Sequence, residues 1–290
     1  AVSWVLCFMA STWCLRHERL VSGSQSEAVS VKGIGAFSWM PDSVSGAVSA
    51  RLFTYLKRDP RQGLMFAFPV IFLILMAFQS HGITPVVWTA LPMSAMFFSI
   101  TESNGLAYDG RGLTMQVISG VSGVADRLGR VRIYVGVILT YLVALTIACF
   151  VVTGDWRTPD GILMGMTFAA GAACLAFCGL GLAEVVSCVL MYPVPSMEKP
   201  FATPQGRAVA QGFFPLVYLL GMFVLAVPSG LVAVVLAVAG QWDMYWVLIP
   251  VFLLNGVGFL ALGSWLGGKL MDARMLSIVS TLDSFASLQK

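Results

Sequence analysis

Apolar stretches alternate with short polar segments along most of this 290-residue chain. A helix needs about 20 apolar residues to cross the hydrocarbon core of a bilayer, and six stretches reach or approach that length once a few flanking residues are added. We therefore predict an all-α fold, a polytopic membrane helix bundle of about six spans. The predicted spans are residues 63–78, 86–100, 134–152, 162–191, 209–239 and 245–266.

Two of these stretches carry further signals. The fourth is rich in glycine, with Gly161 and Gly165 at the small-xxx-small spacing of closely packed membrane helices, although glycine is also common in membrane helices generally. The fifth contains Pro228, which predicts either one kinked span or a span followed by a re-entrant turn.

The segment before the first span divides into three parts. Residues 1–14 form an apolar run whose positive charge follows it, the reverse of a signal peptide, so we expect the end of a preceding, truncated membrane helix. Residues 15–42 are polar and predict a cytoplasmic linker. Residues 43–290 then form a six-span permease domain. It opens with an interfacial helix at 43–58 that Ser43 caps and Pro60 follows.

Composition rules out an ordinary soluble domain, since 58% of the residues are hydrophobic and 11% are charged. The positions of the basic residues indicate the orientation. With six spans, residues 16–61, 101–132, 192–207 and 267–290 lie on one side and hold every Lys and Arg except Arg157. Cytoplasmic flanks collect basic residues, so we expect a multi-pass protein of the plasma membrane with both ends of the six-span unit cytoplasmic.

The sequence gives little support for an enzymatic function. The chain has two histidines, His17 and His81, and none of the H-E-x-x-H, G-x-S-x-G or paired intramembrane aspartate patterns. Cys174 and Cys178 lie one helical turn apart but have no His or carboxylate beside them, so we predict no metal. The run at 263–270, GSWLGGKL, lacks the Ser or Thr of a phosphate loop, so we expect no cofactor and no nucleotide on this chain. We expect no nucleic-acid partner. A membrane-embedded enzyme is the least favoured hypothesis.

A polar island at residues 101–132 separates the second and third predicted spans. Its end, GVADRLGRVR, resembles the signature loop of major facilitator transporters, with the match strongest from Asp126 to Arg130. That resemblance implies a secondary transporter driven by an ion gradient. A basic turn that only obeys the positive-inside rule is the simpler interpretation.

A second resemblance covers nearly the whole chain. The runs ARLFTYLKRDP at 50–60, NGLAYDG at 104–110 and MYPVPSMEKPFATPQG at 191–206 are similar to the permease of ABC-2-type exporters. They are most similar to the C-terminal half of the large actinobacterial type, in which two six-span halves are fused. The resemblance implies a multidrug-type exporter of a hydrophobic or amphipathic substrate (drug, antibiotic or lipid). Its partners would be the other six-span half, fused or paired, and a separate ABC ATPase subunit that binds ATP and Mg.

In such permeases a short coupling helix in this loop sits in a groove of the ATPase. Carried to this chain, the resemblance places the helix at residues 113–124, with Asp109 and Gly110 at its start, where the helix dipole favours an anion. A helix that rests on the lipid bilayer is the alternative. The residues we assign to the coupling loop are Asn104, Asp109, Gly110, Met115, Ile118, Asp126, Arg127 and Arg130.

Glu184 is the one acidic residue well inside an apolar stretch. An intramembrane carboxylate is a functional candidate, so Glu184 is assigned to a possible substrate path. Because the run before it is already about 20 residues long, Glu184 also fits a structural position at the cytoplasmic interface.

Overall fold

The computed structural model of the chain describes residues 37–196 and 208–287, and all regular structure in these ranges is helical. The chain separates into two compact units, Ala1–Ser38 and Trp39–Lys290. Every helix described below belongs to the second unit. The truncated helix predicted at 1–14 and most of the linker predicted at 15–42 lie outside the described residues.

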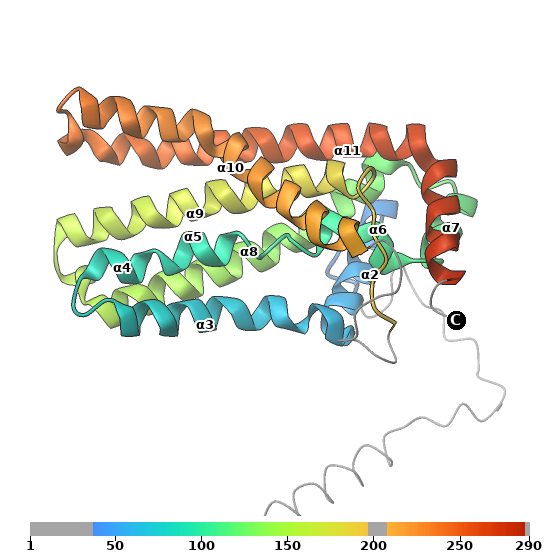
Figure 1. Ribbon diagram of the computed structural model, residues 1–290, viewed down its shortest axis with the longest axis horizontal. Helices are drawn as coiled ribbons and strands as arrows, with labels where there is room; N and C mark the ends of the chain where they lie inside the picture. The colour runs from blue at the N-terminus through green and yellow to red at the C-terminus, as the bar shows by residue number, and fades with distance from the viewer. Residues whose placement is uncertain (1–36, 197–207, 288–290) are drawn as a thin grey trace, which may run out of the picture. The chain divides into compact units, whose positions relative to one another are not determined.

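Long helices alternate with short ones along the described chain (Figure 1). Four of the short elements, η2 to η5, are 3-10 helices. In chain order the elements are α2 (Val44–Arg58), η2 (Pro60–Gln62), α3 (Gly63–Gln79), α4 (Thr84–Trp88), α5 (Ala90–Ala95), η3 (Glu102–Asn104), α6 (Gly105–Asp109), α7 (Gly112–Ile118), α8 (Gly123–Thr153), η4 (Asp155–Arg157), α9 (Pro159–Val186), α10 (Ala208–Val238), η5 (Trp242–Val247) and α11 (Leu248–Ser287).

Four helices in the described part of the chain are long and apolar enough to cross a membrane: α8, α9, α10, and α11 together with η5. Large apolar side chains on α10, including Leu220, Val224 and Leu231, are exposed, as the lipid-facing side of a membrane helix would be. The all-helical fold is therefore confirmed, and its four long apolar helices suggest a protein embedded in a membrane. The prediction of six spans goes beyond these four, because α3 is a shorter apolar helix of 17 residues.

The second predicted span, 86–100, does not form one helix. It consists of α4, α5 and a series of turns, with Pro92 inside α5 and the helix ending at Ala95. Trp88 and Leu91 are fully buried in this segment. Irregular backbone at membrane depth is tolerated where other protein covers it, which explains how the broken segment can lie within the bundle.

The two C-terminal helices are continuous. Pro228 lies inside α10, which Figure 1 shows bending along its length without a re-entrant turn. The helix α11 runs for 40 residues, about 60 Å, so it continues well past residue 266, where the sixth predicted span ends. Figure 1 shows this end, in red, turning away from the line of the bundle.

Glycines bring α9 and α11 into close contact. A Cβ atom added at Gly263 would overlap the backbone of Gly181, and one added at Gly267 would overlap the backbone of Glu184. Such small residues let membrane helices approach closely enough for backbone-level packing. Gly161 and Gly165, at the spacing noted in the sequence, instead face the η4 turn and the rings of Trp88 and Phe150.

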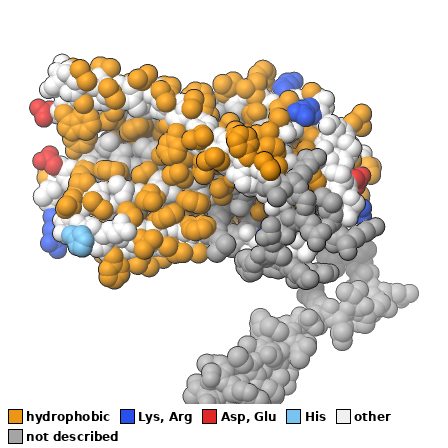
Figure 2. Space-filling view, in the orientation of Figure 1, with side chains coloured by type: hydrophobic (Ala, Val, Ile, Leu, Met, Phe, Trp, Pro, Cys, Tyr) orange, Lys and Arg blue, Asp and Glu red, His pale blue; other side chains and the backbone are white. Residues whose placement is uncertain are grey.

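Charged side chains collect at the two ends of the bundle, with apolar side chains between them (Figure 2). At one end, which we call the basic end, lie α2, α6, α7 and the start of α8. The helix α8 is about 46 Å long, whereas the hydrocarbon core is about 30 Å thick. Its uncharged part, residues 133–153, fills that thickness, so residues 123–132 extend beyond it. The opposite end contains η4 and the turn at Gly240.

We predict that Gly263→Ala destabilises the bundle by about 1–3 kcal/mol, because the new methyl group has to push α11 away from α9. Thermal unfolding in detergent, followed by size-exclusion chromatography, measures the loss as a lower melting temperature. Gly258→Ala is the matched control on the same helix, since a Cβ atom there meets nothing within 4 Å. Equal melting temperatures for the two variants would contradict the close packing.

Candidate functional site

The helix α2 lies against the start of α8. Ser43 caps it as predicted, with its hydroxyl accepting a hydrogen bond from the Gly46 amide at 3.2 Å. The Ser49 hydroxyl donates to the Gly129 carbonyl at 2.8 Å, and a side chain at Gly129 would overlap Val48. The predicted helix at 43–58 is therefore present, and its buried face packs on protein.

A group of buried charged side chains joins the helices at the basic end. We call this group the charge cluster, and η3, α6, α8 and α9 all contribute to it. Almost none of its side-chain surface reaches solvent. Its members are Glu102, Asp109, Asp126, Arg127, Arg130 and Glu184.

Arg130 bridges three acidic residues of the charge cluster. Its Nε donates to Asp126 Oδ2 at 2.8 Å, one turn earlier on α8. Its Nη1 donates to Glu102 Oε1 at 3.1 Å, and its Nη2 donates to Asp109 Oδ2. One guanidinium therefore ties α8 to η3 and α6.

Arg127 connects α8 to α9 and α11. Its Nη1 donates to Glu184 Oε2 at 2.9 Å and to the Ser187 hydroxyl at 3.0 Å. Its Nη2 lies 3.4 Å from the sulfur atoms of both Cys188 and Met271. Glu184 is thus held at the basic end by an ion pair, and its second oxygen, Oε1, is buried without a hydrogen-bond partner.

Arg51 of α2 lies beside the charge cluster, and its own side chain is partly exposed. Its Nη2 lies 3.0 Å from Asp109 Oδ2 and 3.7 Å from Asp126 Oδ1. Burial lowers the pKa of Arg51, and the nearby Arg130 lowers it further. Counting Arg51, four carboxylates face three guanidinium groups.

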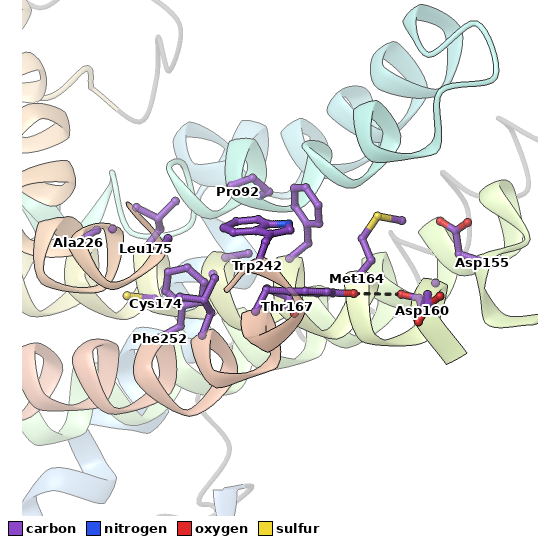
Figure 3. A pocket seen from close by; sticks show the side chains of 18 of the residues that line it. Pro92, Asp155, Asp160, Met164, Thr167, Cys174, Leu175, Ala226, Trp242 and Phe252 are labelled. Atoms are coloured by element: carbon purple, nitrogen blue, oxygen red, sulfur yellow. Dashed lines mark hydrogen bonds between the residues drawn. The ribbon is translucent and has the colours of Figure 1, made fainter. Parts of the chain in front are cut away.

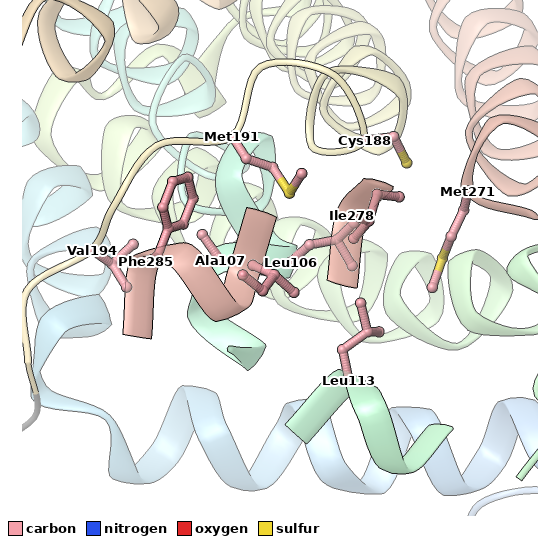
Figure 4. Packing of buried hydrophobic residues seen from close by; sticks show 10 residues of the cluster. Leu106, Ala107, Leu113, Cys188, Met191, Val194, Met271, Ile278 and Phe285 are labelled. Atoms are coloured by element: carbon pink, nitrogen blue, oxygen red, sulfur yellow. The ribbon is translucent and has the colours of Figure 1, made fainter. Parts of the chain in front are cut away.

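The helix α7 touches this arrangement through one side chain. Gln116 Nε2 donates to Asp126 Oδ1 at 3.1 Å. Leu113, at the start of α7, is buried in an apolar core with Leu106 of α6 and Ile278 and Phe285 of α11 (Figure 4). The short helix is therefore anchored on one side to the charge cluster and on another to the end of α11.

The outer side of α7 is apolar and exposed. Met115 is 67% exposed and Ile118 is 75% exposed. Both residues were assigned to the coupling loop from the sequence, and they are the members of that set that a partner could contact directly. The charged members, Asp109, Asp126, Arg127 and Arg130, are instead buried inside the protein.

Two details of the predicted coupling helix are wrong. The helix expected at 113–124 ends at Ile118, and residues 123–132 of the expected loop are the first turns of α8. Ser122 begins α8 by accepting a hydrogen bond from the Ala125 amide at 3.3 Å, which terminates the loop there. Asp109 does not precede α7 as a capping anion, since it is the last residue of α6 and pairs with arginines.

Asn104 and Gly110 each fix the course of the backbone. The side-chain amide of Asn104 makes two hydrogen bonds to the backbone of Tyr192. Its Nδ2 donates to the Tyr192 carbonyl at 2.9 Å, and its Oδ1 accepts from the Tyr192 N–H at 3.2 Å. This contact ties η3 to the segment after α9. Gly110 has φ +53°, a conformation that L side chains rarely adopt, and it turns the chain from α6 into α7.

Next to the charge cluster, Tyr108 of α6 lies under the guanidinium of Arg61, whose Cζ is 5.1 Å from the ring centre. Burial raises the pKa of the Tyr108 phenol, and Arg61 opposes that rise. Arg61 is paired with Asp59 and donates to the Pro195 carbonyl at 2.7 Å.

No group of three His, Cys, Asp or Glu side chains in residues 37–196 and 208–287 is placed to hold a metal ion.

Three residues of the arrangement were not assigned from the sequence. Glu102 directly follows an uncharged run. Arg51 lies one turn after Val48 and directly before Leu52, two buried residues of α2, so both charged residues had a recognisable signal. Asp272 of α11 accepts a hydrogen bond from the Gly123 amide at 2.6 Å, at the start of α8. No local pattern in the sequence predicts that long-range contact.

We predict that Glu184→Ala destabilises the protein by about 3–5 kcal/mol, because it leaves the buried Arg127 without its closest carboxylate. Unfolding in mixed micelles measures this change. Asp283→Asn is the control, since Asp283 is 61% exposed and pairs with an exposed Arg111, an interaction of about 0–1 kcal/mol. A similar small effect for both variants would show that the buried pair contributes little.

Comparison of the chain with family models, with curated proteins and with solved structures finds no match in any of the three. Any conclusion about function therefore depends on the geometry of the basic end and of the membrane helices.

Proposed function

We propose that this chain is one half of the transmembrane permease of an ATP-driven exporter, and that a separate ATPase subunit docks on α7. One observation carries the proposal. An anchored helix at the basic end presents Met115 and Ile118 to solvent, beyond the part of the bundle that fits a bilayer. Exposed apolar side chains on a supported helix suit a protein partner.

The distribution of charge supports a cytoplasmic position for α7. Among the described Lys and Arg residues, only Arg157 lies at the opposite end of the bundle. By the positive-inside rule the basic end faces the cytoplasm. Six crossings fit this orientation when α3 and the broken segment α4–α5 are counted with the four long helices, and both ends of the six-span unit are then cytoplasmic.

The contacts around α7 suit the transmission of force. Gln116 connects α7 to Asp126, and Arg130 and Arg127 connect that point to η3, α6, α9 and α11. Buried ion pairs with several partners resist small displacements, because breaking one of them leaves an uncompensated charge. A push by the ATPase on α7 would therefore move α8, α9 and α11 together.

Energy for transport would come from the partner. The glycine-rich run at 263–270 lies inside α11, where Gly263 and Gly267 pack against α9. A phosphate-binding loop needs free backbone amides at the start of a helix, which this segment does not offer. ATP and Mg belong to the ATPase subunit. The exposed apolar faces of the bundle would contact lipid and the second six-span half.

A secondary transporter driven by an ion gradient is the other candidate. The observation that favours it is the charge cluster itself. Its four carboxylates face three guanidinium groups when Arg51 is counted, and Glu184 Oε1 has no hydrogen-bond partner. Buried carboxylates of this kind occur in proton relays. In that case transport would depend on Asp126 and Arg130 and on the proton gradient, with no need for α7.

The test is co-purification of an ATP-binding cassette subunit from mild detergent. We expect the double variant Met115→Asp and Ile118→Asp to lose the subunit, because it places charge on the apolar docking face. Ile83→Asp, an equally exposed apolar residue in the turn between α3 and α4, is the matched control and should retain it. A wild-type protein that carries no ATPase, and whose transport stops when the proton gradient is dissipated, would contradict the proposal and favour the ion-driven transporter.

A further inference from the structure

A large cavity lies between α9, α10 and α11, toward the end of the bundle opposite α7 (Figure 3). Its volume is about 800 Å³, within the range of sites that bind drug-sized molecules. Pro92 of α5 and the side chains of η5 complete its wall. The charge cluster is not part of this cavity, and Glu184, the residue first assigned to the substrate path, does not line it.

The walls of the cavity are mainly apolar. All three long helices contribute large apolar side chains, among them Met164 and Leu175 of α9, Phe223 of α10 and Phe252 of α11. Small residues keep the space open, for example Gly230 on α10, where an added Cβ atom would meet nothing within 4 Å. Hydrocarbon and aromatic groups of a ligand would be well accommodated between these helices.

The charged groups of the cavity lie at one end and have one sign of charge. Asp155 and Asp160 line that end (Figure 3). The aromatic rings of Trp242 and Tyr245 also line the cavity. The two rings are stacked, with centroids 6.1 Å apart. Among the residues that the structure describes, no Lys or Arg lines the cavity. The walls therefore combine two carboxylates with the faces of two aromatic rings, both of which attract cations.

One carboxylate is held in place and the other is exposed. Asp155 Oδ2 accepts a hydrogen bond from the buried Trp88 indole at 2.7 Å. Asp160 lies in the first turn of α9, and its side chain is exposed. The Tyr245 hydroxyl reaches the Asp160 carbonyl at 3.5 Å, which brings η5 to this end of the cavity. Two further charges lie nearby in the sequence, Asp243 and Arg157. The Arg157 guanidinium lies over the ring of Trp156, 5.3 Å from its centre.

We propose that this cavity binds amphipathic organic cations. The apolar part of the ligand lies between α9, α10 and α11, and its positive charge lies beside Asp160, Asp155 and the Trp242 ring. That such a cation is the exported cargo rests on the proposed export function. The binding site itself does not, because all of its residues belong to this one chain.

A phospholipid acyl chain is the competing occupant, since any apolar cavity in a membrane can take one. The two occupants differ in their response to charge. A hydrocarbon chain interacts equally with the cavity whether residue 160 is charged or neutral. A ligand whose positive charge lies beside Asp160 binds more weakly when the negative charge of residue 160 is removed and the volume of that side chain is kept.

The experiment uses two ions of matched shape and opposite charge, tetraphenylphosphonium and tetraphenylborate. Equilibrium dialysis measures their binding to the full purified chain in an uncharged detergent, with protein-free micelles as the blank. We expect saturable binding of tetraphenylphosphonium that weakens about threefold to fivefold in Asp160→Asn, the upper part of the range for an exposed charge pair. Binding of tetraphenylborate should not weaken in this variant.

Two further variants sharpen the test. Asp42→Asn removes an exposed carboxylate beside α2 and should leave the binding of both ions unchanged. Ala226→Phe fills the cavity from α10 and should reduce the binding of tetraphenylphosphonium, while its elution from size-exclusion chromatography reports whether the bundle still folds. Absence of saturable binding by the wild type, or equal affinity in wild type and Asp160→Asn, would overturn the proposal.

The result can be separated from that of the ATPase test. Binding is measured on the isolated chain, without ATP or any partner. Binding that depends on Asp160, combined with failure to co-purify an ATPase, would leave the cation site standing and refute only the ATP-driven mechanism.

Discussion

The buried guanidinium groups of Arg127 and Arg130 impose the main constraint on this structure. A buried charge is tolerated only when it is paired and hydrogen-bonded, so each of these arginines requires carboxylates in fixed positions. Besides Asp126 on α8 itself, those carboxylates come from the adjoining elements η3 and α6, which precede α8, and from α9, which follows it. The arrangement of the helices at the basic end follows from satisfying these two side chains.

Inside the bilayer the described helices are held together by close packing and not by ion pairs. There α9 and α11 associate through glycines, where the absence of side chains allows the backbones to meet. Ion pairs fix the helices at the basic end, and shape complementarity fixes them in the apolar region. Glu184 and Gly267 lie at the junction of the two, since the backbone of the first packs on the second and its carboxylate enters the charge cluster.

Much of the fold could be predicted from the sequence because local rules determine it. Ser43 caps α2, Thr158 caps α9 after the short turn at η4, and the uncharged runs coincide with α8, α9, α10 and the membrane part of α11. Local rules failed where tertiary contacts prevail. The segment 86–100 is apolar enough to suggest a span, but Pro92 and its burial against α9 and α3 make it irregular.

The candidate site was predictable in part. The density of charge in the segment indicated Asp109, Asp126, Arg127 and Arg130 as candidates. Charged residues in a polar segment are expected to be exposed to solvent. The structure instead buries all four side chains. Their partners Glu102 and Glu184 lie beside apolar runs, and only the folded arrangement brings them to the arginines. The exposure of Met115 and Ile118 also follows only from the folded arrangement, because the apolar core that contains Leu113 covers a different side of α7.

The length of α11 has a mechanical consequence. Phe252 forms part of the cavity wall, whereas Met271, about 28 Å further along the same helix, touches the guanidinium of Arg127. Between them α11 packs on α9 at three glycines, Gly256, Gly263 and Gly267, so the contact extends along the whole distance. One continuous helix therefore joins the wall of the cavity to the charge cluster. Neither end can shift along the helix axis without the other.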